Sequence, residues 1–318
     1  MSFTDQQKEA VDSTETYWSK QSTLVSWFKD PKTILSTNNN GWTDWFADGE
    51  LNTSYLALDY HVEQGRGNQT ALIYDSPVTN TKQKFTYLEL TELVAKFAEV
   101  LQNQDVVKGD RVLIYMPMIP QAAIAMLACA RIGAIHSVVF GGFAAKELAI
   151  RINDAEPKVV VSASCGIEIE KVIPYKPLLD EAIELAKHKP SSCIIYQREQ
   201  LSAPMHSERD YNWQILMDSA QRIAPVPVKS TDPLYILYTS GTTGKPKGVV
   251  RDNGGHAVAM LYSMKNIYGM QTGDTFWAAS DVGWVVGHSY IVYAPLMAGC
   301  STILYEGKPI KTPDAGAF

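Results

Sequence analysis

The residues best suited to chemistry lie in one short loop, Tyr238 to Gly248, with the sequence YTSGTTGKPKG. Its three glycines allow backbone N–H groups to approach a ligand closely. Its hydroxyl side chains and two lysines add hydrogen-bond donors and positive charge, which suits a polyphosphate. The loop is not a Walker A motif, because only two residues separate Gly241 from Gly244 and no serine or threonine follows Lys245. A solvated linker is the alternative, but such linkers rarely carry two lysines directly after a buried strand.

The elements that must position this loop alternate between apolar strands and helices. Strands are predicted at residues 111–116, 135–140, 158–162, 193–196, 234–238, 275–279 and 301–305. Helices are predicted at residues 90–101, 121–132, 144–155, 178–186, 258–268 and 288–296. Strand-helix-strand units of this length imply right-handed crossovers between parallel strands. The predicted fold class is therefore α/β, with mostly parallel sheets flanked by helices.

Two stretches show no such alternation. Residues 1–60 are rich in tryptophan and polar residues, which predicts a packed aromatic lobe without regular elements. Residues 198–230 are polar with several prolines, which predicts a connector.

The composition is that of an ordinary globular protein. Of the 318 residues, 46% are hydrophobic and 19% are charged, and the net charge is −6. Because no basic face is indicated, nucleic acid is not a predicted partner. The four cysteines are widely spaced and form no CxxC pair, which argues against a zinc site or a disulfide framework.

The predictions on membranes and location rest on two segments. The apolar run at residues 121–132 is too short to span a bilayer and contains Arg131, so it predicts a buried helix and no membrane partner. The N-terminus has no apolar signal region and is too acidic for a typical transit peptide. We expect a cytoplasmic protein, with the mitochondrial matrix left open.

The loop resembles the phosphate-binding signature of the adenylate-forming superfamily, which includes acyl-CoA synthetases, luciferases and peptide-synthetase adenylation domains. Further segments resemble the acetyl-/propionyl-CoA synthetase (propionate–CoA ligase) family: residues 45–52, 58–61, 115–118, 128–134, 139–143 and 281–290. The similarity covers nearly the whole chain from about Trp18 onward. It implies an acetyl-CoA synthetase-type N-terminal segment at 1–66. An AMP-binding (adenylation) domain, incomplete at its C-terminal end, would occupy 67–318.

The resemblance also implies a two-step reaction that uses ATP, Mg²⁺ and CoA. A short-chain carboxylate attacks the α-phosphate of ATP, and the CoA thiol then displaces AMP from the acyl-adenylate. The residues implied to hold the leaving pyrophosphate are Thr239, Ser240, Gly241, Thr242, Thr243 and Gly244. Lys245 or Lys247 would offset its developing charge, although Lys247 could also be an ordinary solvated lysine.

Trp284, Val285 and Val286 stand where this family forms its acyl pocket. Acetate-type members have threonine at the position of Val286, whereas valine is typical of propionate-type members. A methyl group in place of a hydroxyl favours one extra methylene by about 1 kcal/mol. Ordinary core packing of this run is the alternative, and His288 beside it could be purely structural. Propionate is thus the expected substrate and acetate the close rival.

The same resemblance implies a CoA site at Phe140, Gly141 and Gly142, with Lys171 near the 3′-phosphate. Acetate-type members have two arginines in the segment 166–171, where this chain has Glu168 and Lys171. Because a carboxylate repels a phosphate, either CoA lies differently here or Lys171 acts alone.

Members of this family are about twice as long as this chain. Their aromatic-Thr-Glu motif, ribose-binding aspartate, hinge and C-terminal lysine domain have no counterpart here, and no metal ligand is predicted within the chain. We therefore expect an N-terminal fragment that is inactive alone. Two alternatives are a non-catalytic nucleotide- or CoA-binding remnant and a half that pairs with a separately encoded C-terminal part.

Overall fold

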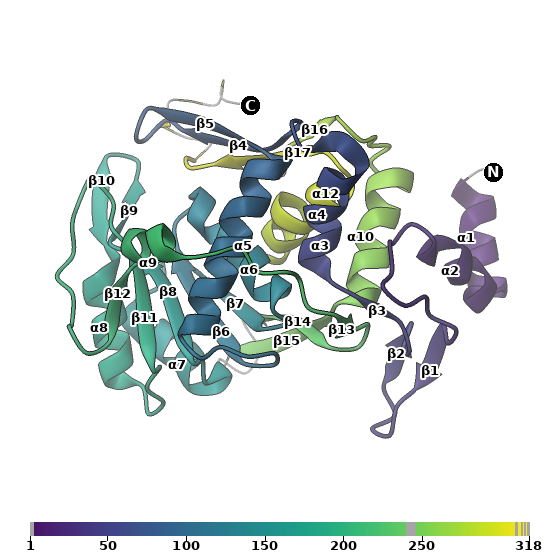
Figure 1. Ribbon diagram of the computed structural model, residues 1–318, viewed down its shortest axis with the longest axis horizontal. Helices are drawn as coiled ribbons and strands as arrows, with labels where there is room; N and C mark the ends of the chain where they lie inside the picture. Colours follow the sequence, from purple (N-terminus) through teal and green to yellow (C-terminus); the bar gives the residue numbers. More distant parts are fainter. Residues whose placement is uncertain (1–2, 240–245, 309–310, 313, 315, 317–318) are drawn as a thin grey trace.

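The computed structural model describes residues 3–239, 246–308, 311–312, 314 and 316. Its N-terminal lobe contains helices α1 (Phe3–Asp12) and α2 (Thr14–Ser22) and the hairpin of β1 (Leu35–Thr37) with β2 (Thr43–Trp45) (Figure 1). The prediction of no regular elements here was wrong, because α1 and α2 form helices although most of their residues are polar. Aromatic packing does occur, since the rings of Trp18 and Trp45 lie 5.9 Å apart.

A seven-stranded sheet forms the centre of the fold. In spatial order its strands are β12 (Asp210–Asn212), β11 (Ser192–Tyr196), β8 (Val159–Ala163), β6 (Arg111–Met116), β7 (Ile135–Phe140), β14 (Pro233–Thr239) and β15 (Lys247–Asp252). All neighbours run parallel except β14 and β15, which form an antiparallel pair. This confirms the predicted class.

Helices cover both faces of this sheet because its central strands are apolar on both sides. Val112 and Ile114 of β6 belong to the core shared with α5 (Tyr87–Asn103) and α6 (Pro120–Arg131). Leu113 and Tyr115 belong to the core shared with α7 (Ala145–Ala155) and α8 (Tyr175–Leu185). The alternation follows from the two-residue period of a strand.

A second sheet has the order β16 (Thr275–Phe276), β17 (Ser301–Tyr305), β4 (Thr70–Ser76) and β5 (Thr81–Thr86). Only its last pair, β4 with β5, is antiparallel. Two small antiparallel pairs complete the sheets: the hairpin of β9 (Cys165–Glu168) with β10 (Lys171–Pro174), and the pair of β13 (Val228–Lys229) with β3 (Glu50–Leu51). None of β4, β5, β9 or β10 was predicted.

The remaining helices are short, apart from α10. They are α3 (Thr53–Ala57), α4 (Asp59–His61), the π-helical turn η1 (Val62–Arg66), α9 (Trp213–Ser219), α10 (Gly254–Asn266), α11 (Val285–Gly287), the π-helical η2 (His288–Tyr293) and α12 (Ala294–Met297). The predicted connector therefore contains β12, α9 and β13. The strand predicted at 275–279 ends at Phe276, and α10 begins four residues before the predicted start.

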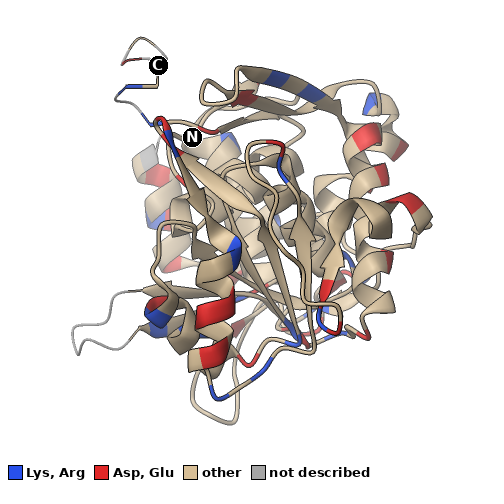
Figure 2. Ribbon diagram, turned by 90° about the vertical axis from the view of Figure 1, so that its left-hand side faces the viewer, with Lys and Arg blue, Asp and Glu red and all other residues tan. Residues whose placement is uncertain are grey.

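The surface carries both signs of charge. Figure 2 shows acidic and basic residues interspersed over the helices and loops of the face that it presents. The four cysteines are buried and unpaired. Among the described residues, no helix combines the length and the apolar character that a membrane span requires.

Candidate active site

The two described ends of the predicted phosphate loop lie side by side. Thr239 ends β14 and Lys247 begins β15, and the two residues are Cα partners in the antiparallel pair. Both side chains are exposed. Five predicted pyrophosphate ligands, Ser240, Gly241, Thr242, Thr243 and Gly244, and the predicted catalytic Lys245 lie outside the described residues. Thr239 lies at the carboxyl end of a parallel strand, which is the usual ligand-binding edge of such a sheet.

Of the predicted CoA-binding residues, Phe140, Gly141 and Gly142 line a cavity at the same edge, whereas Lys171 does not. Phe140 ends β7, and Gly141 and Gly142 follow it directly. Together with Tyr175, these residues line a cavity of about 260 Å³. A Cβ atom at Gly141 would lie only 2.1 Å from the Tyr175 hydroxyl oxygen. Gly141 is thus required for the packing of a ring, in addition to any contact with a ligand.

The predicted acyl-pocket residues are exposed and lie beside this cavity. Trp284, Val285 and Val286 are 47%, 42% and 46% exposed, which excludes core packing among the described residues. The ring of Trp284 lies 5.8 Å from that of Phe140. The structure therefore brings the predicted acyl-pocket and CoA residues together, although they are more than 100 residues apart in the sequence.

Asp281 is the carboxylate at the centre of this arrangement. Its side chain lines the cavity, and its Oδ1 accepts a hydrogen bond from the backbone N–H of Gly283 at 2.7 Å. Burial raises the pKa of this carboxyl to about 6. Sequence reasoning placed Asp281 in a family segment but assigned it no role.

Asp281 gives a prediction on pH. Its folded pKa lies above the unfolded value of about 4, so the folded state loses stability at this residue as the pH rises from about 4 through 6. We expect Asp281→Asn, which keeps the Oδ1 acceptor, to become more stable relative to the parent between pH 4 and pH 7. Urea unfolding at both pH values measures this change.

Asp48 supplies a control of opposite sign for that prediction. Hydrogen bonds from the backbone N–H groups of Thr33 and Lys32 lower its pKa, so its ionised form is the favoured one. Asp48→Asn should therefore cost more stability at pH 7 than at lower pH. A stability difference between Asp281→Asn and the parent that stays constant across the range would contradict the prediction.

Glu168 and Lys171 lie on the β9–β10 pair, where they are Cα partners. The ammonium group of Lys308 pairs with the Glu168 carboxylate. This contact, with a smaller effect of Lys171, lowers the pKa of Glu168. Lys308, which was not predicted, therefore offsets the negative charge that made Glu168 unfavourable near a phosphate. Lys171 itself is exposed.

Glu306 was also missed, although it follows a predicted strand directly and lines the same cavity. Its carboxylate forms a buried bidentate ion pair with Arg198, with N–O distances of 2.7 and 3.0 Å. Because both carboxylate oxygens of Glu306 bind Arg198, Glu306 is not free to bind a metal cation. In the described part of the chain, no three His, Cys, Asp or Glu side chains gather as they would around a metal ion. A magnesium ligand is therefore not identified among these residues.

His288 has a structural environment. It is buried, its Nδ1 lies 3.0 Å from the carbonyl oxygen of Trp284, and its ring stacks on His136 at 5.5 Å. Burial lowers the pKa of His288 to about 4, which keeps the ring neutral.

Comparison with known families decides which family this fold represents. The family described as "AMP-binding enzyme" matches residues 58–317, and "Acetyl-coenzyme A synthetase N-terminus" matches residues 3–57. The chain belongs to the AMP-binding enzyme family. The resemblance seen in the sequence is confirmed, while the predicted division at 66/67 stays a prediction.

Relatives within the AMP-binding enzyme family are similar over almost all of the chain. It is 54% identical over 310 residues to acyl-CoA synthetase short-chain family member 3, mitochondrial, of Homo sapiens, covering 97% of this chain and 45% of that protein. It is 45% identical over 320 residues to propionate–CoA ligase of Escherichia coli (strain K12), covering 100% and 51%. The chain thus spans about half the length of these relatives.

A solved structure supports the fold of this AMP-binding chain. Acetoacetyl-CoA synthetase from Streptomyces lividans superposes with a TM-score of 0.88 at 27% sequence identity. The match covers 98% of this chain and 47% of that structure. The predicted adenylate-forming architecture, with mixed sheets flanked by helices, is therefore confirmed.

Proposed function

We propose that this chain is the N-terminal part of an ATP-dependent propionate–CoA ligase, which forms propionyl-CoA, AMP and pyrophosphate through an acyl-adenylate. The supporting observation is the meeting of three predicted sites at one sheet edge. These are the adjoining ends of β14 and β15, the exposed Trp284–Val286 run and the cavity beside Phe140. The names of two similar proteins, a short-chain acyl-CoA synthetase and a propionate–CoA ligase, support the same reaction class.

In this proposal the chain's own residues act mainly by positioning. Thr239 and the residues after it would hold the departing pyrophosphate, and Lys247 would offset its charge. Trp284 and Val286 would hold the alkyl group of the acid while its carboxylate attacks the α-phosphate. Bound Mg²⁺ would supply further charge stabilisation on the phosphate oxygens. The CoA thiol would then reach the acyl-adenylate along the cavity beside Gly141.

A substitution at Val286 tests the acid preference. We expect Val286→Thr to shift the ratio of propionate to acetate activity toward acetate by about fivefold, because a hydroxyl replaces the methyl that favours the extra methylene. ATP–pyrophosphate exchange with acetate, propionate and butyrate measures the ratio. Val249→Thr, at an exposed valine of β15, is the matched control.

The assay is run on this chain and on a chain extended to the length of its relatives. We propose that the 318-residue chain alone shows no exchange. Exchange that is strongest with acetate would favour the acetate rival. A ratio that Val286→Thr leaves unchanged would contradict the role of Val286 in the acid preference. A cytoplasmic location, with the mitochondrial matrix as the alternative, is part of the same proposal.

A further inference from the structure

A cavity of about 500 Å³ lies between the C-terminal end of α10 and the segment formed by α4 and η1. Two cationic side chains line it, Arg66 of η1 and Lys265 of α10. None of the described residues that line it is an aspartate or a glutamate. It shares no lining residue with the cavity beside Phe140 and contains none of the residues of β14 or β15. This cavity is therefore separate from the proposed adenylation site.

His61 fixes the orientation of the Arg66 guanidinium. The His61 side chain is buried, and its Nε2 lies 3.1 Å from the carbonyl oxygen of Met297. Because a carbonyl oxygen can only accept, Nε2 carries the ring proton and Nδ1 is an acceptor. Nδ1 accepts hydrogen bonds from Nε and Nη2 of Arg66, at 3.2 and 2.8 Å. Burial lowers the pKa of His61 to about 4, so this acceptor persists at neutral pH.

The charge of Arg66 is not offset by a neighbouring acid. Among the described residues, neither Arg66 nor Lys265 has a carboxylate oxygen within 4.0 Å. Glu63, on the same turn as Arg66, instead accepts a hydrogen bond from the hydroxyl of Tyr55 at 2.7 Å. The Nη1 atom of Arg66 has no hydrogen-bond partner in the described part of the chain. Both the charge and a donor of Arg66 are thus available to an anion.

The helix end beside the cavity is already capped. The carbonyl oxygen of Met264 accepts a hydrogen bond from the backbone N–H of Met270 at 2.9 Å, and that of Ser263 accepts two further backbone hydrogen bonds. These bonds reduce the partial negative charge that a free helix C-terminus would present to an anion.

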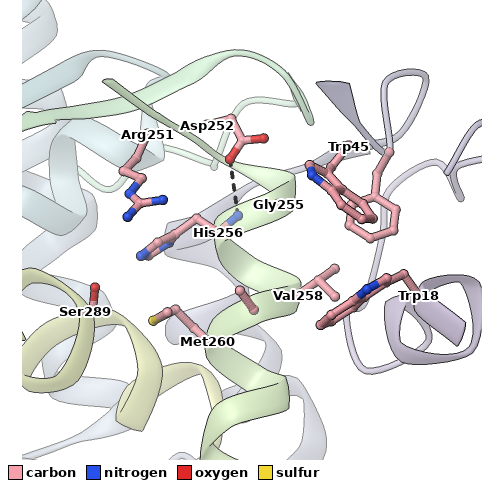
Figure 3. A pocket seen from close by; sticks show the side chains of 11 residues that line it. Trp18, Trp45, Arg251, Asp252, Gly255, His256, Val258, Met260 and Ser289 are labelled. Carbon is pink, nitrogen blue, oxygen red and sulfur yellow. Dashed lines mark hydrogen bonds between the residues drawn. The ribbon is translucent and has the colours of Figure 1, made fainter. Parts of the chain in front are cut away.

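The groove on the preceding turns of α10 differs in this respect (Figure 3). It also contains an arginine, Arg251, but the Asp252 carboxylate lines the same groove, and the two charges attract each other. The ring nitrogens of His256 are buried and inaccessible to a ligand. That groove therefore does not offer a separate anion site.

The remaining lining of the cavity beside Arg66 is largely aliphatic. It consists mainly of Leu24, Leu261, Met264, Met270 and Met297. Methionine has three rotatable bonds and a polarizable sulfur, so such a wall adapts to an unbranched chain more readily than a rigid one would. The volume lies within the range of small-molecule sites. A cationic group beside an adaptable aliphatic wall suits a fatty carboxylate.

We propose that this cavity binds a medium-chain fatty carboxylate. The carboxylate pairs with the guanidinium of Arg66, and the ammonium group of Lys265 adds positive charge to the same cavity. The alkyl chain lies against Leu261 and the methionines. This site goes beyond the proposed ligase function, and binding to it does not depend on that function.

The test titrates the chain with octanoate, butyrate, octan-1-ol and inorganic phosphate, followed by calorimetry. Octanoate should bind about tenfold or more tightly than butyrate, because each buried methylene adds to the affinity. Octan-1-ol, which lacks the charge, should bind about tenfold more weakly than octanoate. Phosphate lacks the alkyl chain and should bind more weakly than octanoate.

Methionine methyl NMR locates the bound octanoate. Labelled with ¹³C at the methyl groups, the chain should show shifted signals for the methionines of this cavity, Met264, Met270 and Met297. Met118 lines the cavity beside Phe140, and Met126 is buried in α6, so neither signal should move.

Substitutions separate the charge from the aliphatic wall. Arg66→Gln, which keeps a donor for His61, should weaken octanoate binding by about tenfold, and Arg66→Lys should weaken it less. Met270→Glu places a carboxylate in the lining and should abolish binding. The matched control is Arg222→Gln, at an exposed arginine paired with Glu92, which should leave binding unchanged. Circular dichroism verifies that each variant is folded.

Several results would overturn the proposal. They are equal affinity for octanoate and octan-1-ol, preference for phosphate, binding that survives Arg66→Gln or Met270→Glu, and no binding of octanoate at millimolar concentration. A shift of the Met118 signal without shifts of the other three would place octanoate beside Phe140. That result would also overturn the proposal, while leaving the proposed ligase function intact.

Discussion

Replacing Arg198 by methionine is expected to lower the free energy of unfolding by about 3–5 kcal/mol. Arg198 and Glu306 are only 6% and 4% exposed, and their two N–O contacts join the segment after β11 to the segment after β17. Tyr74 and Ser76 also donate hydrogen bonds to Glu306, at 2.5 and 2.9 Å. Methionine fills a similar volume but leaves a buried carboxylate without its cation. Urea unfolding followed by fluorescence measures the loss.

Two further variants separate charge from packing in that experiment. Arg222→Met removes an exposed arginine paired with Glu92 and should cost no more than about 1 kcal/mol. The double variant Arg198→Met with Glu306→Gln removes the unpaired charge but keeps an acceptor for the two hydroxyls. It should be more stable than Arg198→Met alone. A cost for Arg198→Met no larger than that of the Arg222 control would show that the ion pair does not hold the two sheets together.

Gly287→Ala is expected to disrupt the candidate acyl pocket. A Cβ atom at this position would lie 1.9 Å from the carbonyl oxygen of Asp281 and 2.7 Å from the Cα of Val282. These are backbone atoms, so no side-chain rotation relieves the contact and the whole turn from Asp281 to Val286 must shift. We expect a loss of about 3 kcal/mol in the free energy of unfolding. Unfolding in urea and the emission of Trp284 report the change.

The same substitution should affect activity in a chain extended to the length of its relatives. A displacement of about 1 Å at a substrate-positioning segment reduces activity by about 100-fold. Gly67→Ala is the matched control, because a Cβ there would meet its nearest neighbours at ordinary distances of 3.6 and 3.7 Å. If Gly287→Ala matches this control in both stability and exchange rate, the turn does not position the acyl group.

The sequence allowed the central sheet to be predicted well, because its strands are buried on both faces. β6 and β7 were predicted to the residue, since each is a mainly apolar run bounded by turn residues. The strand β5, TKQKFT, was not predicted, because it is polar and largely exposed. The helix α10 begins earlier than predicted because Gly254 and Gly255 have low helix propensity, yet both lie in its first turn, where the Asp252 carboxylate accepts a hydrogen bond from the backbone N–H of His256.

In the candidate site, too, some features could be predicted from the sequence and others could not. Its glycines and its Trp284–Val286 run stand in contiguous motifs that a single sequence displays. The pairs that shape its electrostatics join distant positions, as Glu168 does with Lys308 and Arg198 with Glu306. No periodicity or spacing reports such contacts, which arise only when two sheets meet. For Asp281, the sequence shows an ionisable residue in a family segment, but it does not show that the side chain is buried and that its pKa is therefore raised.

The parallel pairing of β4 with β17 has a consequence for synthesis of the chain. Ser76, at the end of β4, bonds to Glu306 across 230 residues of sequence. At roughly 5–20 residues per second, a ribosome needs roughly 10–50 s to supply the partner of β4 after β4 itself has emerged. During this interval the β4–β5 hairpin has one open apolar edge. Nascent chains stalled before residue 301 should therefore bind chaperones. Chains stalled well beyond residue 306 should release them.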